Sequence, residues 1–220
     1  MTEPGYLEKL PFWERLTDHE KEFVQANSNI RRYSKERIIL NSEIECLGMS
    51  MVLDGELRTC ILSEEGREIT LYRLHEGEIC VLTASCAVSQ ITFETQMSVS
   101  ADCVLLVLGT AAFEKLISQN IYARCFAYEM LCERFSSVMW TMQMILFKGY
   151  DRRLASFLIG EYEHTGLATI QMTHEQIAQY TNSAREVVAR MLKRFAADGL
   201  VEFKRGRITL KNIKALQTMI

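Results

Sequence analysis

Three charged side chains near the C-terminus have the chemistry needed to read DNA bases. They are Arg185, Glu186 and Arg190, and the last lies about one helical turn beyond the first two. Arginine can donate two hydrogen bonds to guanine O6 and N7, and glutamate can accept one from the N4 amino group of cytosine. On a helix that enters the major groove, these side chains would contact base edges. The alternative is a charged helix face that meets only solvent.

Two short helices are expected to present these side chains. Thr173 with Gln176 and Ser183 with Glu186 each form a capping-box pair, which predicts two helix starts ten residues apart. The second helix is expected to end at Gly199, a residue that readily adopts positive φ. Its buried face would carry apolar residues at spacings of three and four, namely Val187, Val188, Met191, Leu192 and Phe195. The pattern predicts a compact helix-turn-helix.

A basic hairpin follows at once and strengthens the DNA-binding interpretation. Two β-like runs, 201–203 and 207–210, flank a turn at Lys204-Arg205-Gly206. Cations at a hairpin tip suit contacts with phosphate groups, which position a protein on DNA without specifying sequence. The expected contacts to the DNA backbone are Thr173, Ser183, Lys193, Lys204, Arg205 and Arg207.

The run NSAREVVARMLKRFAADGLV at 182–201 resembles the recognition helix and wing entry of the Crp/Fnr family of bacterial transcription factors. In that family the matching Arg, Glu and Arg read a half-site that contains G and C. The resemblance therefore implies base-reading roles for Arg185, Glu186 and Arg190. It also implies an α+β architecture, in which an antiparallel β-roll like a cyclic-nucleotide-binding double-stranded β-helix precedes a long dimerisation helix and a winged helix-turn-helix.

Charge and strand patterns divide the chain in agreement with this architecture. The net charge of −3 combines +4 over residues 149–220 (11 basic, 7 acidic) with −7 over residues 1–148 (14 basic, 21 acidic). Short β-like runs between residues 30 and 108, separated by Asp-Gly and Glu-Gly pairs, predict an antiparallel roll or barrel. We expect a sensor domain at 1–119, a dimerisation helix at 120–148 and a DNA-binding domain at 149–220. Asp151 is the expected N-cap of the helix that opens the last domain.

A heptad pattern on the long helix predicts a homodimer. The expected dimer seam consists of Tyr128, Leu131, Phe135, Val138, Met142 and Ile145, at alternating spacings of three and four. Two reading heads related by a twofold axis would bind half-sites about one helical turn apart. The seam could instead pack against the roll of its own chain. A neighbouring stripe of Met130, Trp140, Met144 and Phe147 is expected to face that roll.

The effector segment departs from the pattern of cyclic-AMP-binding relatives. Gly77 and Glu78 match its beginning, but Val81 and Leu82 stand where the resemblance leads us to expect Gly-Glu. Neither Arg nor Lys occurs between Arg73 and Lys115, so this stretch supplies no partner for a cyclic phosphate. We therefore expect no binding of cyclic AMP in the usual manner. The candidate effector pocket comprises Gly77, Glu78, Cys80, Val81, Leu82 and Cys86.

The seven cysteines leave several possibilities open for this sensor. No C-x-x-C pair occurs and residues 1–45 contain no cysteine, so the N-terminal iron-sulfur cluster of the fumarate-nitrate branch is absent. Cys80 and Cys86 could be buried small hydrophobes, a redox-sensing thiol pair or thiolate ligands of a haem or cluster. An apolar pocket for a small effector is equally compatible, and the cofactor remains unknown.

We predict a regulator that binds double-stranded DNA as a homodimer and works with RNA polymerase and an unidentified effector. No catalytic constellation and no metal site is predicted, and the absence of long apolar runs or a signal peptide predicts a cytoplasmic protein without membrane association. The alternatives are a metal- or redox-dependent enzyme on a β-roll and a cyclic-nucleotide-binding module without a DNA role.

Overall fold

A computed structural model of the 220-residue chain describes residues 4–40, 47–81 and 95–220. The chain divides into two compact units. The first comprises Met1–Glu65 with Leu71–Val138, and the second comprises Gly66–Thr70 with Met139–Ile220. In the described ranges, no helix is long and apolar enough to cross a membrane.

Short helices open the first unit. They are α1 (Pro4–Leu7), the 3-10 helix η1 (Trp13–Arg15) and α2 (Asp18–Ala26). A capping box starts α2, because Thr17 Oγ1 accepts a hydrogen bond from the Glu20 amide and the Glu20 carboxylate accepts one from the Thr17 amide. Phe12 packs against Phe126 of a later helix, with 5.2 Å between the ring centroids.

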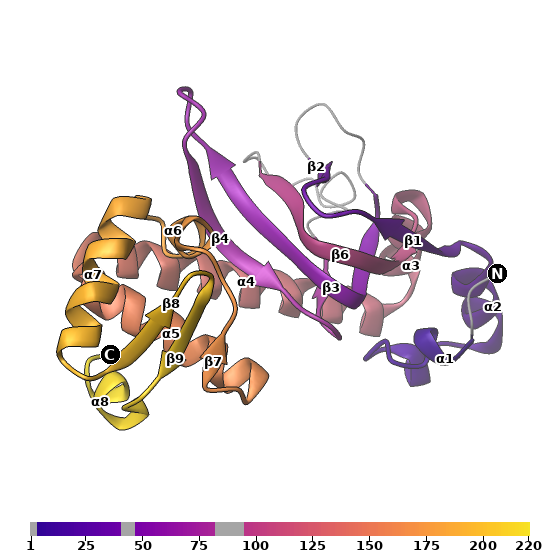
Figure 1. The fold of residues 1–220 in the computed structure, drawn as a ribbon. Coiled ribbons are helices and arrows are strands. Elements are labelled where there is room, and N and C mark those ends of the chain that lie inside the picture. The colour runs from indigo at the N-terminus through magenta and orange to yellow at the C-terminus, as the bar shows by residue number, and fades with distance from the viewer. Residues whose placement is uncertain (1–3, 41–46, 82–94) are drawn as a thin grey trace. The chain divides into compact units, whose positions relative to one another are not determined.

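The sensor sheet has six strands in the described ranges, and β6 pairs with β1, β2 and β3, and β3 with β5, in the predicted antiparallel sense. The strands are β1 (Ser28–Tyr33), β2 (Ile38–Leu40), β3 (Met49–Leu62), β4 (Glu68–Leu74), β5 (Ile79–Cys80) and β6 (Gln96–Leu108). Their order is β1-β6-β3-β4, with β2 also on β6 and β5 also on β3. Figure 1 shows β3 and β4 as one long hairpin.

Asp54-Gly55 is an Asp-Gly pair of the kind expected to separate two strands in a hairpin, and this expectation is wrong because the pair lies inside the continuous strand β3. The register of β3 on β6 shifts around it, which identifies a bulge rather than a turn. Gly55 has φ 87°, and a Cβ atom there would overlap the Asp102 carbonyl oxygen of β6. Glycine is therefore required at position 55 for close strand approach, and local sequence does not distinguish this requirement from that of a turn.

Two helices complete the first unit. They are α3 (Thr110–Gln119) and α4 (Ile121–Phe147), and the division between the units falls within α4, after Val138. Asn120 starts α4, since its side-chain oxygen accepts hydrogen bonds from the amides of Tyr122 (3.0 Å) and Ala123 (3.1 Å). Ala123, Phe126 and Ala127 then bury their side chains in the core of this unit.

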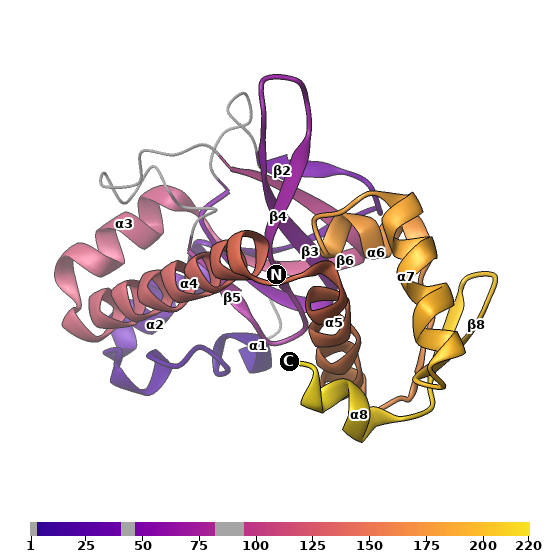
Figure 2. The ribbon, with the colours of Figure 1, turned by 90° about the vertical axis from the view of Figure 1, so that its left-hand side faces the viewer.

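The second unit contains α5 (Tyr150–Thr165), β7 (Thr169–Ile170), α6 (His174–Tyr180), α7 (Arg185–Ala197), β8 (Val201–Lys204), β9 (Arg207–Leu210) and α8 (Ile213–Thr218). Its sheet has the order β7-β9-β8. Figure 2 shows α8 beside α5, and the two helices are in contact. The core joins Leu154 and Leu158 of α5 to Leu192 and Phe195 of α7, and all four side chains are almost completely buried.

Asp151 is not the N-cap of α5, contrary to the prediction. The helix begins two residues earlier than expected, at Tyr150, and Gly149 occupies the N-cap position without a side-chain hydrogen bond. Asp151 lies in the first turn and accepts a hydrogen bond from the Arg152 amide at 3.0 Å. A carboxylate is favourable in either place because it faces the positive end of the helix dipole.

Candidate nucleic-acid interface

Helix α6 begins as its sequence requires. Thr173 Oγ1 accepts a hydrogen bond from the Gln176 amide at 3.2 Å, and the Gln176 side chain accepts one from the Thr173 amide at 2.9 Å. The predicted capping box is therefore confirmed. It satisfies two amides that a helix start would otherwise leave free, and this fixes where the first helix of the pair begins.

The turn between α6 and α7 is held by side chains that sequence patterns did not identify. Asn182 adopts φ 52°, in the left-handed region that asparagine tolerates better than most residues. Arg153 Nη1 donates to the carbonyl oxygens of Thr181 (3.1 Å) and Asn182 (3.3 Å), and the Tyr150 hydroxyl lies 3.0 Å from Thr181 Oγ1. Two residues of α5 thus fix the angle at which α7 leaves the turn.

Burial affects both residues that hold this turn. It lowers the pKa of the Arg153 guanidinium, an effect that Tyr150 opposes, and it raises the pKa of the Tyr150 phenol. The raised pKa of Tyr150 moves away from neutral pH. The pKa of Arg153 is not lowered far enough to reach neutral pH, because arginine ordinarily titrates above about 12. Arg153 therefore remains a cation and Tyr150 remains a neutral hydroxyl. Neither residue is part of a sequence motif, which is why the pattern-based reading missed them.

The start of α7 differs from the prediction. Ser183 does not cap this helix, because the helix begins at Arg185 and its N-cap, Ala184, makes no side-chain hydrogen bond. The Ser183 amide instead donates to the Ala178 carbonyl at 2.9 Å and closes the turn. Ser183 is half-buried. The helix end agrees with the prediction, because α7 finishes at Ala197 and Gly199 has φ 70°.

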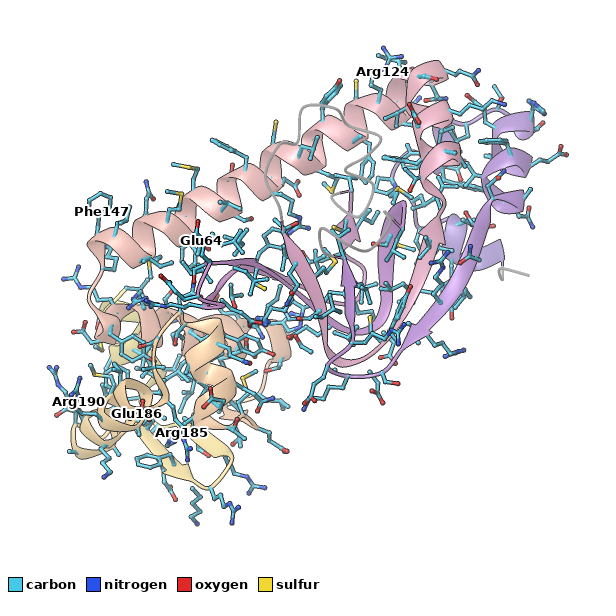
Figure 3. All side chains as sticks on the ribbon, turned by 90° about the horizontal axis from the view of Figure 1, so that it is seen from above. Glu64, Arg124, Phe147, Arg185, Glu186 and Arg190 are labelled. Atoms are coloured by element: carbon cyan, nitrogen blue, oxygen red, sulfur yellow. The ribbon has the colours of Figure 1, made fainter. Side chains whose placement is uncertain are left out.

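Arg185, Glu186 and Arg190 are all exposed on α7 (Figure 3). The opposite face buries Val188, Leu192 and Phe195, each 1% exposed or less. Because the apolar residues hold the helix to the rest of the unit, the three polar side chains are free to reach a ligand. Lys193 and Arg194 are also exposed, and Arg194 lies 3.8 Å from Asp198 in a surface ion pair that contributes little to stability.

The hairpin of β8 and β9 forms the predicted wing, with a tighter turn at Arg205-Gly206. Lys204, Arg205 and Arg207 are exposed there. Glu202 lies on the same strand as Lys204. The Lys211 ammonium lies 2.8 Å from the Glu202 carboxylate, and its hydrogen bond and charge lower the pKa of Glu202. The wing tip therefore presents three exposed cations, one of which, Lys204, also lies 3.8 Å from Glu202 in a surface ion pair.

One aromatic contact joins the wing to α6. The rings of Phe203 and His174 meet edge to face, with 6.0 Å between their centroids. Burial, and secondly the charge of Arg185, lower the pKa of His174. The imidazole is therefore neutral near pH 7. A neutral ring at this place packs on Phe203 without adding a charge beside the base-reading helix.

Comparison with known proteins identifies this architecture. Residues 30–120 match the cyclic nucleotide-binding domain, and residues 152–219 match the Crp-like helix-turn-helix domain. A crystal structure of a transcriptional regulator of the Crp/Fnr family from Eubacterium rectale ATCC 33656 shares 37% sequence identity. The alignment covers 96% of this chain and 98% of that one, with a TM-score of 0.88. This chain belongs to the Crp/Fnr family.

More distant Crp/Fnr structures share the fold. FixK2 from Bradyrhizobium japonicum is 16% identical, with a TM-score of 0.73 over 87% of this chain and 96% of that chain. A CooA mutant from Carboxydothermus hydrogenoformans is 20% identical, with a TM-score of 0.71 over 95% of this chain and 94% of that chain. The search of curated proteins gave no match. The protein is thus a Crp/Fnr-type transcription regulator with a DNA-binding helix-turn-helix.

Helix α4 of this Crp/Fnr protein is apolar on two opposite faces. One face packs on the first unit's core through Phe126 and Ala127, with Met130 and Leu131 partly buried beside them. The other carries a line of exposed residues at alternating spacings of three and four, and we call it the exposed heptad line. It consists of Cys125, Tyr128, Cys132, Phe135, Met139, Met142 and Leu146.

The exposed heptad line differs from the predicted seam at alternate positions. Tyr128, Phe135 and Met142 belong to both lines and are exposed, at 54%, 67% and 45% respectively. Leu131, Val138 and Ile145 are partly buried, and the residue after each of them is the exposed one. The stripe expected to face the roll also divides: Met130 and Met144 are covered, whereas Trp140 (54%) and Phe147 (79%) are exposed. Figure 3 shows Phe147 at the end of α4 opposite Arg124.

The predicted effector pocket lies partly within the described ranges. Cys80 and Val81 are buried. Gly77 has φ 85° and lies in a turn in which the Glu78 carboxylate accepts a hydrogen bond from the His75 amide at 2.8 Å. Leu82 and Cys86 lie outside the described residues. Among the residues that the structure does describe, no group of three or more His, Cys, Asp or Glu could hold a metal ion.

Helix α4 supplies a cation to this region that the sequence reading did not anticipate. Arg134 Nη2 lies 3.5 Å from Glu78 Oε1 and 3.4 Å from the Ile79 carbonyl oxygen. Its guanidinium also lies 5.1 Å from the centroid of the Tyr72 ring. Burial raises the pKa of the Tyr72 phenol, which therefore stays neutral. Arg134 lies outside residues 74–114, where the sequence has neither Arg nor Lys. It is 56 positions beyond Glu78 in the chain, and only the fold brings the two side chains together.

Proposed function

We propose that the protein is a homodimeric regulator that places α7 of each copy in the major groove of a palindromic operator. The outward position of Arg185, Glu186 and Arg190 on a helix anchored by its apolar face carries this proposal. In this proposal, residues 1–119 form the domain that senses the effector, residues 120–148 form the dimerisation helix and residues 149–220 bind DNA. The regulator would act in the cytoplasm, together with RNA polymerase.

The three side chains can read bases in complementary ways. Arg185 and Arg190 can each donate two hydrogen bonds to a guanine, and Glu186 can accept one from a cytosine. They stand in the first and second turns of α7, the part of a recognition helix that reaches base edges. Arg153 orients these positions through the turn carbonyls that it holds.

The DNA backbone is assigned to a separate group of residues. The wing cations Lys204, Arg205 and Arg207 would neutralise phosphates, as would Lys193 on α7. Thr173 is exposed at the start of α6, where its hydroxyl donates to Gln176 Oε1 at 3.0 Å, and on DNA this hydroxyl would donate to a phosphate oxygen instead. Ser183, at the turn, is assigned the same role.

The exposed heptad line supports the homodimer. A helix that is apolar on all sides is normally buried on all sides, and one face of α4 already packs on its own unit. A heptad repeat matches a second helix with the same repeat. Two copies would also give two reading heads, as a palindrome requires. An operator search and sedimentation analysis test the two parts separately.

We also propose that the effector is not cyclic AMP bound in the usual manner. Val81 is buried where cyclic-AMP-binding relatives carry a polar pair, and the adjacent Cys80 is buried too. The signal would instead be a small molecule or an oxidant that acts near Gly77, Glu78 and Cys80. In either case, titration calorimetry with cyclic AMP should show no saturable heat. Saturable binding would contradict this part of the proposal alone.

Paired substitutions test the reading head. Arg190→Ala should relax the base preference at one operator position and cost about 1–3 kcal/mol against the preferred base there. Lys204→Ala should weaken binding to all sequences alike and reduce the salt dependence, because it removes one phosphate contact. Binding to a randomised operator library, followed by sequencing, measures both effects. A uniform loss over all sequences in both variants would remove Arg190 from the base-reading group.

A further inference from the structure

Two cysteines occupy matching places on α4. Cys125 and Cys132 are both exposed free thiols, and they are seven residues apart on the exposed heptad line. Aromatic residues, Tyr128 and Phe135, alternate with them. Cys60, Cys80 and Cys103 are buried instead. Burial, and secondly Asp54, raise the pKa of Cys103 to about 11, which keeps that thiol protonated and unreactive.

The helix prevents these two thiols from pairing within one chain. Seven residues of α-helix rise about 10.5 Å, whereas the Cα atoms of a disulfide lie about 4.4–6.8 Å apart. An intrachain bond would therefore require α4 to unfold around Tyr128. While the helix is intact, Cys125 and Cys132 therefore cannot pair with each other.

The proposed dimer would bring identical positions together. Two heads that read one duplex lie at the same end of the dimer, so their α4 helices run parallel. In a parallel pair, each seam residue faces its own copy across the twofold axis. Helix axes pack about 8–10 Å apart and each Cα atom lies about 2.3 Å from its axis, which leaves facing Cα atoms about 3.4–5.4 Å apart, a range whose upper half overlaps the distances found in disulfides.

We propose that Cys125 and Cys132 are thiol-modification sites that form symmetric disulfides, each with its own copy, and make the dimer covalent under oxidising conditions. The oxidant is a low-molecular-weight disulfide. One cysteine thiolate attacks it, forms a mixed disulfide and releases one small thiol. The thiolate of the facing cysteine then attacks the mixed disulfide, forms the bond between the protomers and releases the second small thiol. This inference rests on the proposed homodimer.

The bond would change when the regulator can bind DNA. A non-covalent dimer dissociates on dilution, and its operator affinity then depends on protein concentration. A covalent dimer keeps both reading heads together at any concentration. Reduction by a thiol reverses the bond, so the oxidation state of the small-thiol pool would set the regulator's activity at low abundance.

The test treats the full-length protein with oxidised glutathione or with dithiothreitol and separates it on a denaturing, non-reducing gel. The oxidised protein should run at twice the 25.3 kDa chain mass, and dithiothreitol should restore the single mass. Cys125→Ser and Cys132→Ser should each still cross-link through the remaining seam cysteine. The double variant should not cross-link, although it keeps the other five of the seven cysteines.

Sedimentation of the reduced protein separates the two proposals. If the reduced protein is a dimer and oxidation yields no cross-link, the disulfide inference fails and the dimer stands. If the reduced protein stays monomeric at high concentration and no cross-link forms, the dimer fails and the inference fails with it. Cross-linking that persists in the double variant would assign the reaction to other cysteines and overturn the inference.

Discussion

Phe135 offers the sharpest test of the exposed heptad line. Its side chain is 67% exposed in the single chain, which makes it one of the largest apolar surfaces on α4. A phenylalanine side chain offers about 200 Å² to a partner. Two thirds of this is exposed, and alanine would retain a small part, so Phe135→Ala would remove about 100 Å² of buried apolar area per copy at full burial.

This area predicts a large effect on dimerisation. At about 25 cal/mol per Å², each copy loses about 2.5 kcal/mol, and the two copies together lose about 5 kcal/mol. The dimer dissociation constant should therefore rise by a factor of about 10³ to 10⁴. Folding of the single chain should be unaffected because the side chain contributes little to its own unit's core. Sedimentation equilibrium measures the constant, and circular dichroism checks the fold.

Phe147→Ala is the matched control. Phe147 lies on the same helix and is 79% exposed, but it stands outside the exposed heptad line. Its replacement should leave the dissociation constant within a factor of a few. If Phe147→Ala weakens the dimer as much as Phe135→Ala, or if Phe135→Ala has no effect, α4 does not associate along the line that the structure exposes.

Three further outcomes are expected. Arg153→Ala should lower the free energy of unfolding by about 1–2 kcal/mol, because two turn carbonyls lose a charged donor, whereas Arg152→Ala at an exposed position should be near neutral in the same urea titration. The lowered pKa of His174 means that the folded state favours the neutral imidazole. The contribution of His174 to stability should therefore be present above about pH 6.5 and be lost as the pH falls below that value. His174→Gln should flatten this part of the Tm against pH curve, and an unchanged slope would remove His174 as its source. Gly55→Ala should destabilise the fold more than Gly66→Ala. Both positions have positive φ, which costs about 1–2 kcal/mol for alanine, but only at Gly55 would the new Cβ overlap a backbone carbonyl; equal losses in thermal unfolding would argue against that close approach.

Local rules predicted the reading head well. The Thr173 capping box, the positive φ of Gly199 and the apolar face of α7 are properties of neighbouring residues, and they followed from spacing alone. The same rules failed at Ser183, where the fragment Ser-x-x-Glu has a capping pattern that the chain does not use. Its amide is already bonded to Ala178, so the turn begins α7 one residue later than the pattern requires.

Residue spacing could not predict which heptad line of α4 is exposed. This helix is apolar around most of its circumference, so two heptad lines that share Tyr128, Phe135 and Met142 fit the sequence equally well. The choice between Leu131 and Cys132 depends on which of them the first unit's core covers. Leu131 packs there, and Cys132 is left exposed.

The order of residues along the chain thus determined the family, the antiparallel strands and the exposed polar face of α7, because each depends on contacts within one element or one motif. Tertiary structure alone decided that Asp54-Gly55 is a bulge, that Arg153 holds the recognition turn and that Arg134 approaches Glu78. Each of these three depends on a backbone or side chain brought from 28 or more positions away. No periodicity within a single helix or strand can encode a partner at such a separation, because the packing of whole elements against one another selects it.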